Sequence, residues 1–242
     1  MHYSPTSEEV RTTTAALTKA LEALKLRCCL VGGVACSSYG NSRTPNDVDM
    51  VVLDCVWTQE ELKRQLVATD PNFFTVASKD PYATYRVLFY RLLDSTLSHL
   101  YTSSRSSNVR NYSSYSRSSY KRCKVDLLLP GIMNIPSVPK DRIPFDRRSQ
   151  PLMPFLPLLL LKLQAWQDHG ESTKDYMRRK QPIDVADITE MLNLAATKYP
   201  RVKLDKDKEW LPESFVEAAR TRVRLFIRKH SYTKEHWRRL GF

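Results

Sequence analysis

Residues 30–53 read LVGGVACSSYGNSRTPNDVDMVVL, and two features stand close together in this stretch. Gly32 and Gly33 directly follow an apolar run, as in a tight turn from a strand into a helix, where backbone amides can approach a phosphate. Asp47 and Asp49 open the next apolar run. Residues two apart on an extended strand point to the same face, so we expect both carboxylates to project together.

A third carboxylate, Asp126, lies inside a later apolar run, KVDLLL, at residues 124–129. Taken alone, the glycine pair fits a structural turn, and Asp47 with Asp49 fits a solvated edge strand. The apolar neighbours of Asp49 and Asp126 instead predict that these acids point into the sheet, where an unpaired carboxylate is costly. Oxygen ligands suit Mg²⁺, which leaves room for substrate phosphates. We therefore expect the three acids to bind Mg²⁺ or Mn²⁺.

The order of these residues over 27–130 resembles the signature of the DNA polymerase β-type nucleotidyltransferases, most closely the minimal members related to AbiEii-type toxins. The resemblance implies a helix after the glycine pair, a strand on which Asp47 and Asp49 bind two metal ions, and a later strand that brings Asp126. The other matching residues are Leu30, Val31, Ala35, Tyr39, Gly40, Arg43, Met50, Val51 and Val52.

The helical part of the chain also resembles the AbiEii pattern. It contains Leu161-Lys162-Leu163-x-Ala165 and then Lys180-x-x-x-Asp184-x-x-Asp187. The resemblance implies that Lys162 binds the triphosphate, whereas the residues alone also allow a lysine that extends from an apolar helix to solvent. Asp184 has an equally good structural interpretation as the partner of Lys180 on one helix face.

The turn before the metal strand departs from the family pattern. Arg43 stands four residues before the first Asp, as in the family, but Pro45 occupies the position usually held by Ser or Thr. Arg43 can pair with a phosphate or with Asp47. Since Gly33 replaces the small hydroxyl residue of other branches, a hydroxyl contact to the terminal phosphate would come from Ser37 or Ser38.

The mechanism implied is two-metal nucleotidyl transfer. Asp47 and Asp49 would hold both ions and Asp126 would share one, so that the attacking hydroxyl loses its proton more easily. Amides of the glycine turn, Arg43 and Lys162 would offset charge on the leaving phosphates. The predicted substrate-binding residues are Gly32, Gly33, Ser37, Ser38, Arg43 and Lys162.

Hydrophobic periodicity places a small mixed sheet in the first half of the chain and helices in the second. The predicted class is α/β (α+β): a nucleotidyltransferase core over residues 1–135, followed by a helical C-terminal region over 150–242 that packs on the core. A Ser/Tyr/Arg-rich insertion at about 101–121 has little aliphatic surface to bury, so it is either a tolerated loop or a segment that stacks on nucleic acid or is phosphorylated. Strands are expected at 27–31, 47–53, 73–77, 85–92 and 125–129, and helices at 7–26, 58–68, 155–168, 184–197, 212–229 and 233–240.

Composition limits the classes of protein and of site. The longest apolar run, residues 152–163, is interrupted by Pro154 and Pro157 and is shorter than the ~20 residues of a membrane span, and no secretory signal is visible. Five cysteines without a Cys-x-x-Cys pair suit a reducing compartment. Five histidines without ligand spacing argue against zinc. We expect an intracellular, cytoplasmic protein, with a nuclear location left open.

The formal net charge is +12, and the excess is concentrated in two segments. Residues 105–124 contain six basic residues and no acid, and residues 220–239 contain eight against Glu235 alone. Such segments attract polyanions through counterion release, although basic helices are often only solvated faces. We expect a nucleoside triphosphate such as ATP as donor. The basic surface favours RNA as acceptor, and the resemblance suggests the end of a tRNA; a protein acceptor stays open, whereas like charges disfavour a cationic aminoglycoside. A catalytically silent nucleic-acid or partner-binding module and a toxin-like effector are the alternatives.

Overall fold

The computed structural model describes residues 3–92 and 121–242. The predicted insertion at 101–121 lies outside these ranges except for its last residue, Lys121. Within the described ranges, no helix combines the length and the apolar character that a membrane crossing requires. All five cysteines are free thiols, and all but Cys55 are buried.

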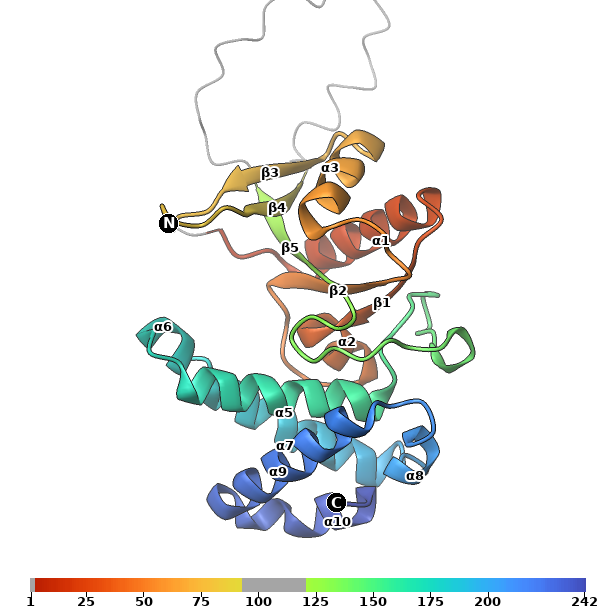
Figure 1. Ribbon diagram of the computed structural model, residues 1–242, viewed down its shortest axis with the longest axis vertical. Coiled ribbons are helices and arrows are strands. Elements are labelled where there is room, and N and C mark those ends of the chain that lie inside the picture. Colours follow the sequence, from red (N-terminus) through yellow and green to blue (C-terminus); the bar gives the residue numbers. More distant parts are fainter. Residues whose placement is uncertain (1–2, 93–120) are drawn as a thin grey trace, which may run out of the picture. The chain divides into compact units, whose positions relative to one another are not determined.

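A five-stranded sheet (Figure 1) contains the three predicted metal ligands, Asp47, Asp49 and Asp126. Its strand order is β1-β2-β5-β4-β3, so β2 and β5 are neighbours although 68 residues separate Leu53 from Arg122 in the sequence numbering. The β1–β2, β3–β4 and β4–β5 pairs are antiparallel, and Val31 pairs with Asp49. The strands are β1 (Arg27–Val31), β2 (Asp47–Leu53), β3 (Phe73–Ala77), β4 (Arg86–Arg91) and β5 (Arg122–Leu128).

The chain divides into two compact units whose segments alternate along the sequence. The first comprises Met1–Lys25, Asn46–Val48 and Val56–Asp126. Its helices α1 (Ser7–Ala23) and α3 (Gln59–Thr69) both begin with capping boxes, Thr6 with Glu9 and Thr58 with Glu61. Such boxes satisfy amides that the first helical turn leaves open. Within this unit α1 contacts α3, and α3 contacts β3.

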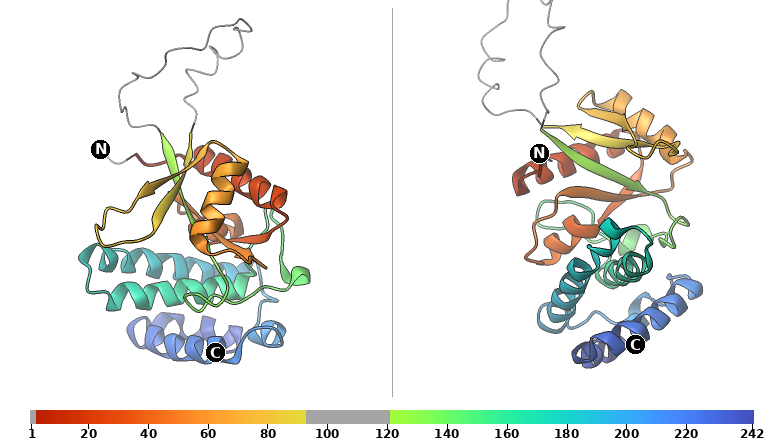
Figure 2. Two further views of the ribbon diagram at one scale, coloured as in Figure 1. Left: turned by 45° about the horizontal axis from the view of Figure 1, so that its top comes forward. Right: turned by 90° about the vertical axis from the view of Figure 1, so that its left-hand side faces the viewer.

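The second unit comprises Leu26–Pro45, Asp49–Cys55 and Leu127–Phe242. Its central helix is α5 (Phe155–Glu171), which contacts α2 (Gly32–Tyr39), α7 (Gln181–Thr197) and α9 (Glu213–Lys229). Figures 1 and 2 show α5 and α7 side by side. The remaining elements are η1 (Lys140–Arg142), α6 (Asp175–Arg178), α8 (Leu204–Asp207), η2 (Ser231–Thr233) and α10 (Lys234–Leu240).

Aromatic residues connect the helices of the second unit. Trp166 of α5 meets Phe226 of α9 edge-on at a ring-centroid distance of 4.9 Å, and Phe226 lies 6.3 Å from Trp237 of α10. Phe226 and Trp237 are completely buried. Because aromatic side chains bury large apolar areas, these contacts hold the C-terminal helices to α5.

The predicted class, α/β with a sheet and a helical C-terminal half, is confirmed. Two expectations about elements were wrong. The helix expected at residues 184–197 already begins at Gln181, because Pro182 lies in the first turn of α7, where proline is tolerated since its missing N–H has no intrahelical acceptor. Strand β5 starts at Arg122 rather than at residue 125, because pairing with β4 extends to Arg91. The contact-based units have other boundaries than the domain division at 1–135 and 150–242, which stays a prediction.

Candidate metal centre

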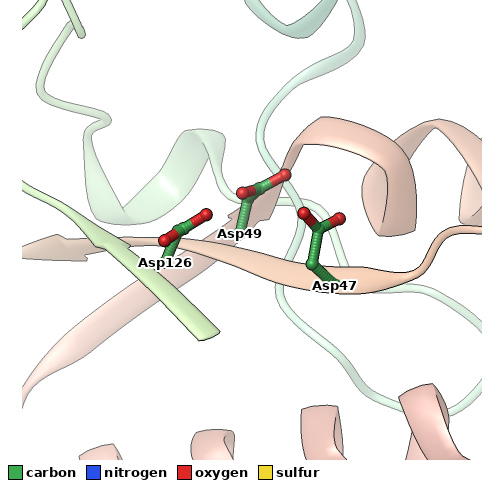
Figure 3. A group of neighbouring side chains, drawn as sticks. All are labelled: Asp47, Asp49 and Asp126. Atoms are coloured by element: carbon green, nitrogen blue, oxygen red, sulfur yellow. The ribbon is translucent and has the colours of Figure 1, made fainter. Parts of the chain in front are cut away.

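Three carboxylates meet on one face of the sheet (Figure 3). Asp47 and Asp49 lie on β2, and Asp126 lies on the neighbouring strand β5. One carboxylate oxygen of each residue lies within 4.8 Å of those of the other two. The i,i+2 spacing on β2 and the position of Asp126 on β5 therefore bring together the three predicted ligands.

The three acids are partly exposed rather than buried. Their apolar neighbours Val48, Met50 and Val125 are buried on the opposite side of the strands. The expectation that the acids point into the interior was therefore wrong: the apolar runs reflect the other face of a pleated strand. Partial exposure leaves the carboxylates accessible to an ion and its substrate.

Three carboxylates and one lysine lie close together at this site. Lys124 forms an ion pair with Asp126, and it lies two residues away on the same strand. Three carboxylates whose oxygens lie so close repel one another, and a hard divalent cation relieves that repulsion while it accepts oxygen ligands. The donor set therefore fits Mg²⁺ or Mn²⁺.

Gly32 makes the close approach of Asp49 possible. It begins α2 with φ +62°, a left-handed conformation that favours glycine. A Cβ atom at this position would lie 1.9 Å from Oδ2 of Asp49. Two features therefore require glycine here: the left-handed backbone conformation and the carboxylate beside it. The first turn of α2 thus lies next to Asp49, a candidate metal ligand.

Gly33 fulfils a second packing requirement. A Cβ there would lie 3.0 Å from Nη2 of Arg43 and 3.0 Å from Cβ of Pro45. The guanidinium and the proline therefore pack against the first turn of α2. This contact gives Pro45, which departs from the family pattern, a structural role.

Arg43 pairs with Asp187 of α7, which lies 144 residues further along the chain. Its Nε lies 3.0 Å from Oδ1 and its Nη2 lies 3.0 Å from Oδ2 of the carboxylate, a two-pronged ion pair. Asp187 is 2% exposed. The partners considered for Arg43 were a phosphate and Asp47; the ion pair described here is with Asp187, and a phosphate contact stays a prediction.

Lys162 of α5 joins the same group. Its Nζ lies 2.8 Å from Oδ2 of Asp187 and 3.8 Å from Oδ1 of Asp184. The lysine side chain is 11% exposed, so it does not extend to solvent. Asp184 also contacts Nδ1 of His169, which replaces the expected pair with Lys180. We call Arg43, Lys162, His169, Asp184 and Asp187 the charge cluster.

Within the charge cluster, the pKa values of Asp187 and Lys162 are shifted. Burial by itself raises the pKa of Asp187, but hydrogen bonds from Arg43 and Lys162 outweigh it and hold the pKa below its ordinary value. For Lys162, burial lowers the pKa, and the neighbouring Cys36 and Asp187 more than compensate, so that its pKa is raised. Both groups are therefore charged at neutral pH. Burial also raises the pKa of the Cys36 thiol to about 12, which keeps it protonated.

The other predicted site residues are placed as follows. Ser37 and Ser38 are exposed on α2, and the Ser38 hydroxyl lies 3.4 Å from Asp146. Their phosphate contacts stay predictions. His169 was missed, because a single histidine without ligand spacing carries no signal in the sequence. Asp187 was noted in the motif but not chosen, since its partner Arg43 is remote in sequence.

Comparisons with known proteins support the fold. No protein-family model matches the chain, and no curated protein matches it. The structure is similar to the crystal structure of an antigenic nucleotidyltransferase-like protein from Paracoccidioides brasiliensis, with a TM-score of 0.59 and 17% sequence identity. The similarity covers 96% of this chain and 94% of that chain. At this identity it shows a nucleotidyltransferase-like fold.

Proposed function

We propose that the chain is a metal-dependent nucleotidyltransferase that moves a nucleoside monophosphate from a triphosphate such as ATP to an acceptor hydroxyl on RNA. The observation that carries this proposal is the convergence of Asp47, Asp49 and Asp126, with carboxylate oxygens within 4.8 Å. The nucleotidyltransferase-like fold supports it. The AbiEii-like branch and an intracellular, cytoplasmic location remain part of the proposal, and the free cysteines agree with that location.

Each part of the site has a task in this proposal. Asp47, Asp49 and Asp126 would hold two Mg²⁺ or Mn²⁺ ions, which in such sites neutralise the phosphates and lower the pKa of the attacking hydroxyl. The first backbone N–H groups of α2 have no acceptor within the helix, so they can donate to phosphate oxygens, and the positive end of the helix dipole favours the phosphate charge. Because Gly32 has no side chain, the carboxylate of Asp49 can lie directly beside the N-terminal end of α2.

The charge cluster would act by positioning. Asp187 forms ion pairs with Arg43 and Lys162, and these pairs hold the two cations in fixed positions. Arg43 lies against Gly33 in the first turn of α2. Its charge can stabilise the leaving phosphates through space, and a direct contact requires it to exchange the carboxylate of Asp187 for a phosphate.

The experiment that tests the proposal is incubation of the protein with Mg²⁺ or Mn²⁺, total RNA and each α-labelled nucleoside triphosphate in turn. The matched control is Asp47→Asn/Asp49→Asn, which keeps the side-chain shape and removes two charges. Label on RNA only with intact acids supports the proposal and names the nucleotide. Label on protein moves the acceptor, and no label on any acceptor favours the silent binding module.

A further inference from the structure

A pocket of about 210 Å³ lies at the end of α7, where α10 contacts that helix. Apolar side chains, among them Leu192, Ala196 and Leu240, form part of its lining. Its polar lining is entirely basic and consists of Lys203, His236 and Arg239. The described residues that line the pocket thus combine an apolar surface with cationic groups, which suits an anionic ligand with an apolar portion.

His236 supplies a second observation that points to a ligand. Its Nδ1 is buried and has no hydrogen-bond partner among residues 3–92 and 121–242. A buried polar atom without a hydrogen-bond partner is destabilising, so most such atoms have one. His236 thus adds to the pocket lining an imidazole whose Nδ1 has no partner among the described residues.

Helices α9 and α10 carry four arginines, which we call the arginine band: Arg220, Arg224, Arg238 and Arg239. Arg239 lines the pocket. Arg220 of α9 lies 3.5 Å from the carbonyl of Gly241, two residues beyond Arg239, and its guanidinium lies over the Phe242 ring. Arg224 follows one turn later on α9 and is exposed.

Two glutamates offset part of this charge. Glu235 pairs with Arg238 and, at 3.7 Å, with Arg239, and Glu217 lies 3.6 Å from Arg220. Exposed ion pairs of this kind contribute little to stability. A polyanion can therefore replace the glutamates at little cost, and arginine presents the planar fork that matches phosphate.

We propose that the pocket binds one backbone phosphate of the RNA acceptor and that the arginine band holds the phosphates next to it. This inference rests on the proposed function, because it concerns the acceptor of that reaction. With about 210 Å³, the pocket is smaller than the roughly 300 Å³ at which sites for drug-sized ligands begin. It therefore suits a phosphate with part of its ribose.

The first test measures the affinity of the full chain for labelled single-stranded RNA by fluorescence anisotropy. All proteins carry Asp49→Asn, so that no transfer alters the RNA. The test variant is Lys203→Ala/Arg239→Ala, and the control is Lys19→Ala/Arg64→Ala, which removes one exposed lysine and one exposed arginine elsewhere. We expect the test variant to bind about tenfold more weakly and the control less than about threefold, with the salt slope shallower by about 0.7 for each lost phosphate contact.

A second variant tests the shape of the pocket separately from its charge. Ala196→Leu narrows the cavity and leaves every charge in place, and a melting curve confirms that it folds. We expect weaker RNA binding and loss of competition by inorganic phosphate, which should compete in the parent protein. RNA affinity equal to that of the parent would overturn the proposal.

Two further measurements distinguish the docking proposal from the proposed transferase activity and from a protein partner. If polyglutamate binds as tightly as RNA and responds equally to both pocket variants, the partner is an acidic polypeptide and the RNA assignment is overturned. Transfer activity is measured separately on protein with Asp49 intact. Pocket-dependent RNA binding without transfer supports docking and refutes the enzyme, whereas transfer with unchanged binding in the variants refutes docking alone.

Discussion

At the scale of single residues, Asp49 carries the most direct expectation. Asp49→Asn should lower transfer by at least about a hundredfold, because the site loses one of its ligands and a full charge. Without added metal the variant should melt at the same or a slightly higher temperature, since one repulsive charge is gone. Mg²⁺ should raise the melting temperature of the native protein and leave that of the variant unchanged.

The control for Asp49 is Asp141→Asn, which alters a 79% exposed carboxylate in η1. It should keep both the transfer activity and the Mg²⁺-dependent rise in melting temperature. If Mg²⁺ stabilises Asp49→Asn as much as the native protein, the acids do not form the metal site.

Gly32 offers a second test at this scale, with Gly131 as a matched control. Both have positive φ, +62° and +83°, but an added Cβ at Gly131 meets nothing within 4 Å. Each change to alanine should cost roughly 1–2 kcal/mol of unfolding free energy for the left-handed backbone. Only Gly32→Ala should also lose the Mg²⁺ response, measured by differential scanning fluorimetry, because its Cβ displaces Asp49. Equal Mg²⁺ responses in the two variants would contradict the close approach.

At the scale of elements, the charge cluster connects α5, α7 and the segment before β2. Asp187→Asn leaves Arg43 and Lys162 without a charged partner at that position, and breaking a buried ion pair costs about 3 kcal/mol or more. The control is Asp175→Asn, which breaks an exposed pair with Arg178 in α6 and should cost less than about 1 kcal/mol. Urea unfolding measures both, and similar costs would show that the cluster does not hold these elements together.

The pH dependence of that stability follows from the pKa directions. The folded-state pKa of Asp187 is lowered, so its contribution is present above about pH 4 and is lost as the pH falls through the folded value. The folded-state pKa of Lys162 is raised, so its contribution is present below about pH 10.5 and is lost as the pH rises further. The difference in unfolding free energy between the native protein and Asp187→Asn should therefore narrow at acid pH. A difference that stays constant through that range would contradict this assignment.

At the scale of the whole molecule, the net charge of +12 favours polyanions, and such binding weakens as salt is added. Each neutralised phosphate of a single strand contributes about −0.7 to the slope of log affinity against log salt. RNA affinity should therefore fall by at least about tenfold between about 50 and about 200 mM salt. Filter binding of native protein measures this, and a flat response would exclude RNA as a partner held by charge.

Much of the architecture follows from local patterns. Strands β1, β2 and β3 have the predicted bounds, because their apolar runs and the turns beside them report burial directly. The predicted metal ligands also come together, since the i,i+2 spacing places Asp47 and Asp49 on one face. The predicted bounds were less accurate for two elements. The start of β5 depends on its pairing with β4, and the start of α7 depends on a proline that its first turn tolerates.

By itself, the sequence determined the class of fold, the order of the main elements and the three acids of the candidate metal centre. Only the tertiary structure decided which partner each charged residue takes. Arg43 meets Asp187 across 144 residues, and Gly32 meets Asp49 because β1 and β2 lie in register. The physical reason is that periodicity records which face of an element is buried, whereas the choice of an ionic partner depends on how distant elements pack.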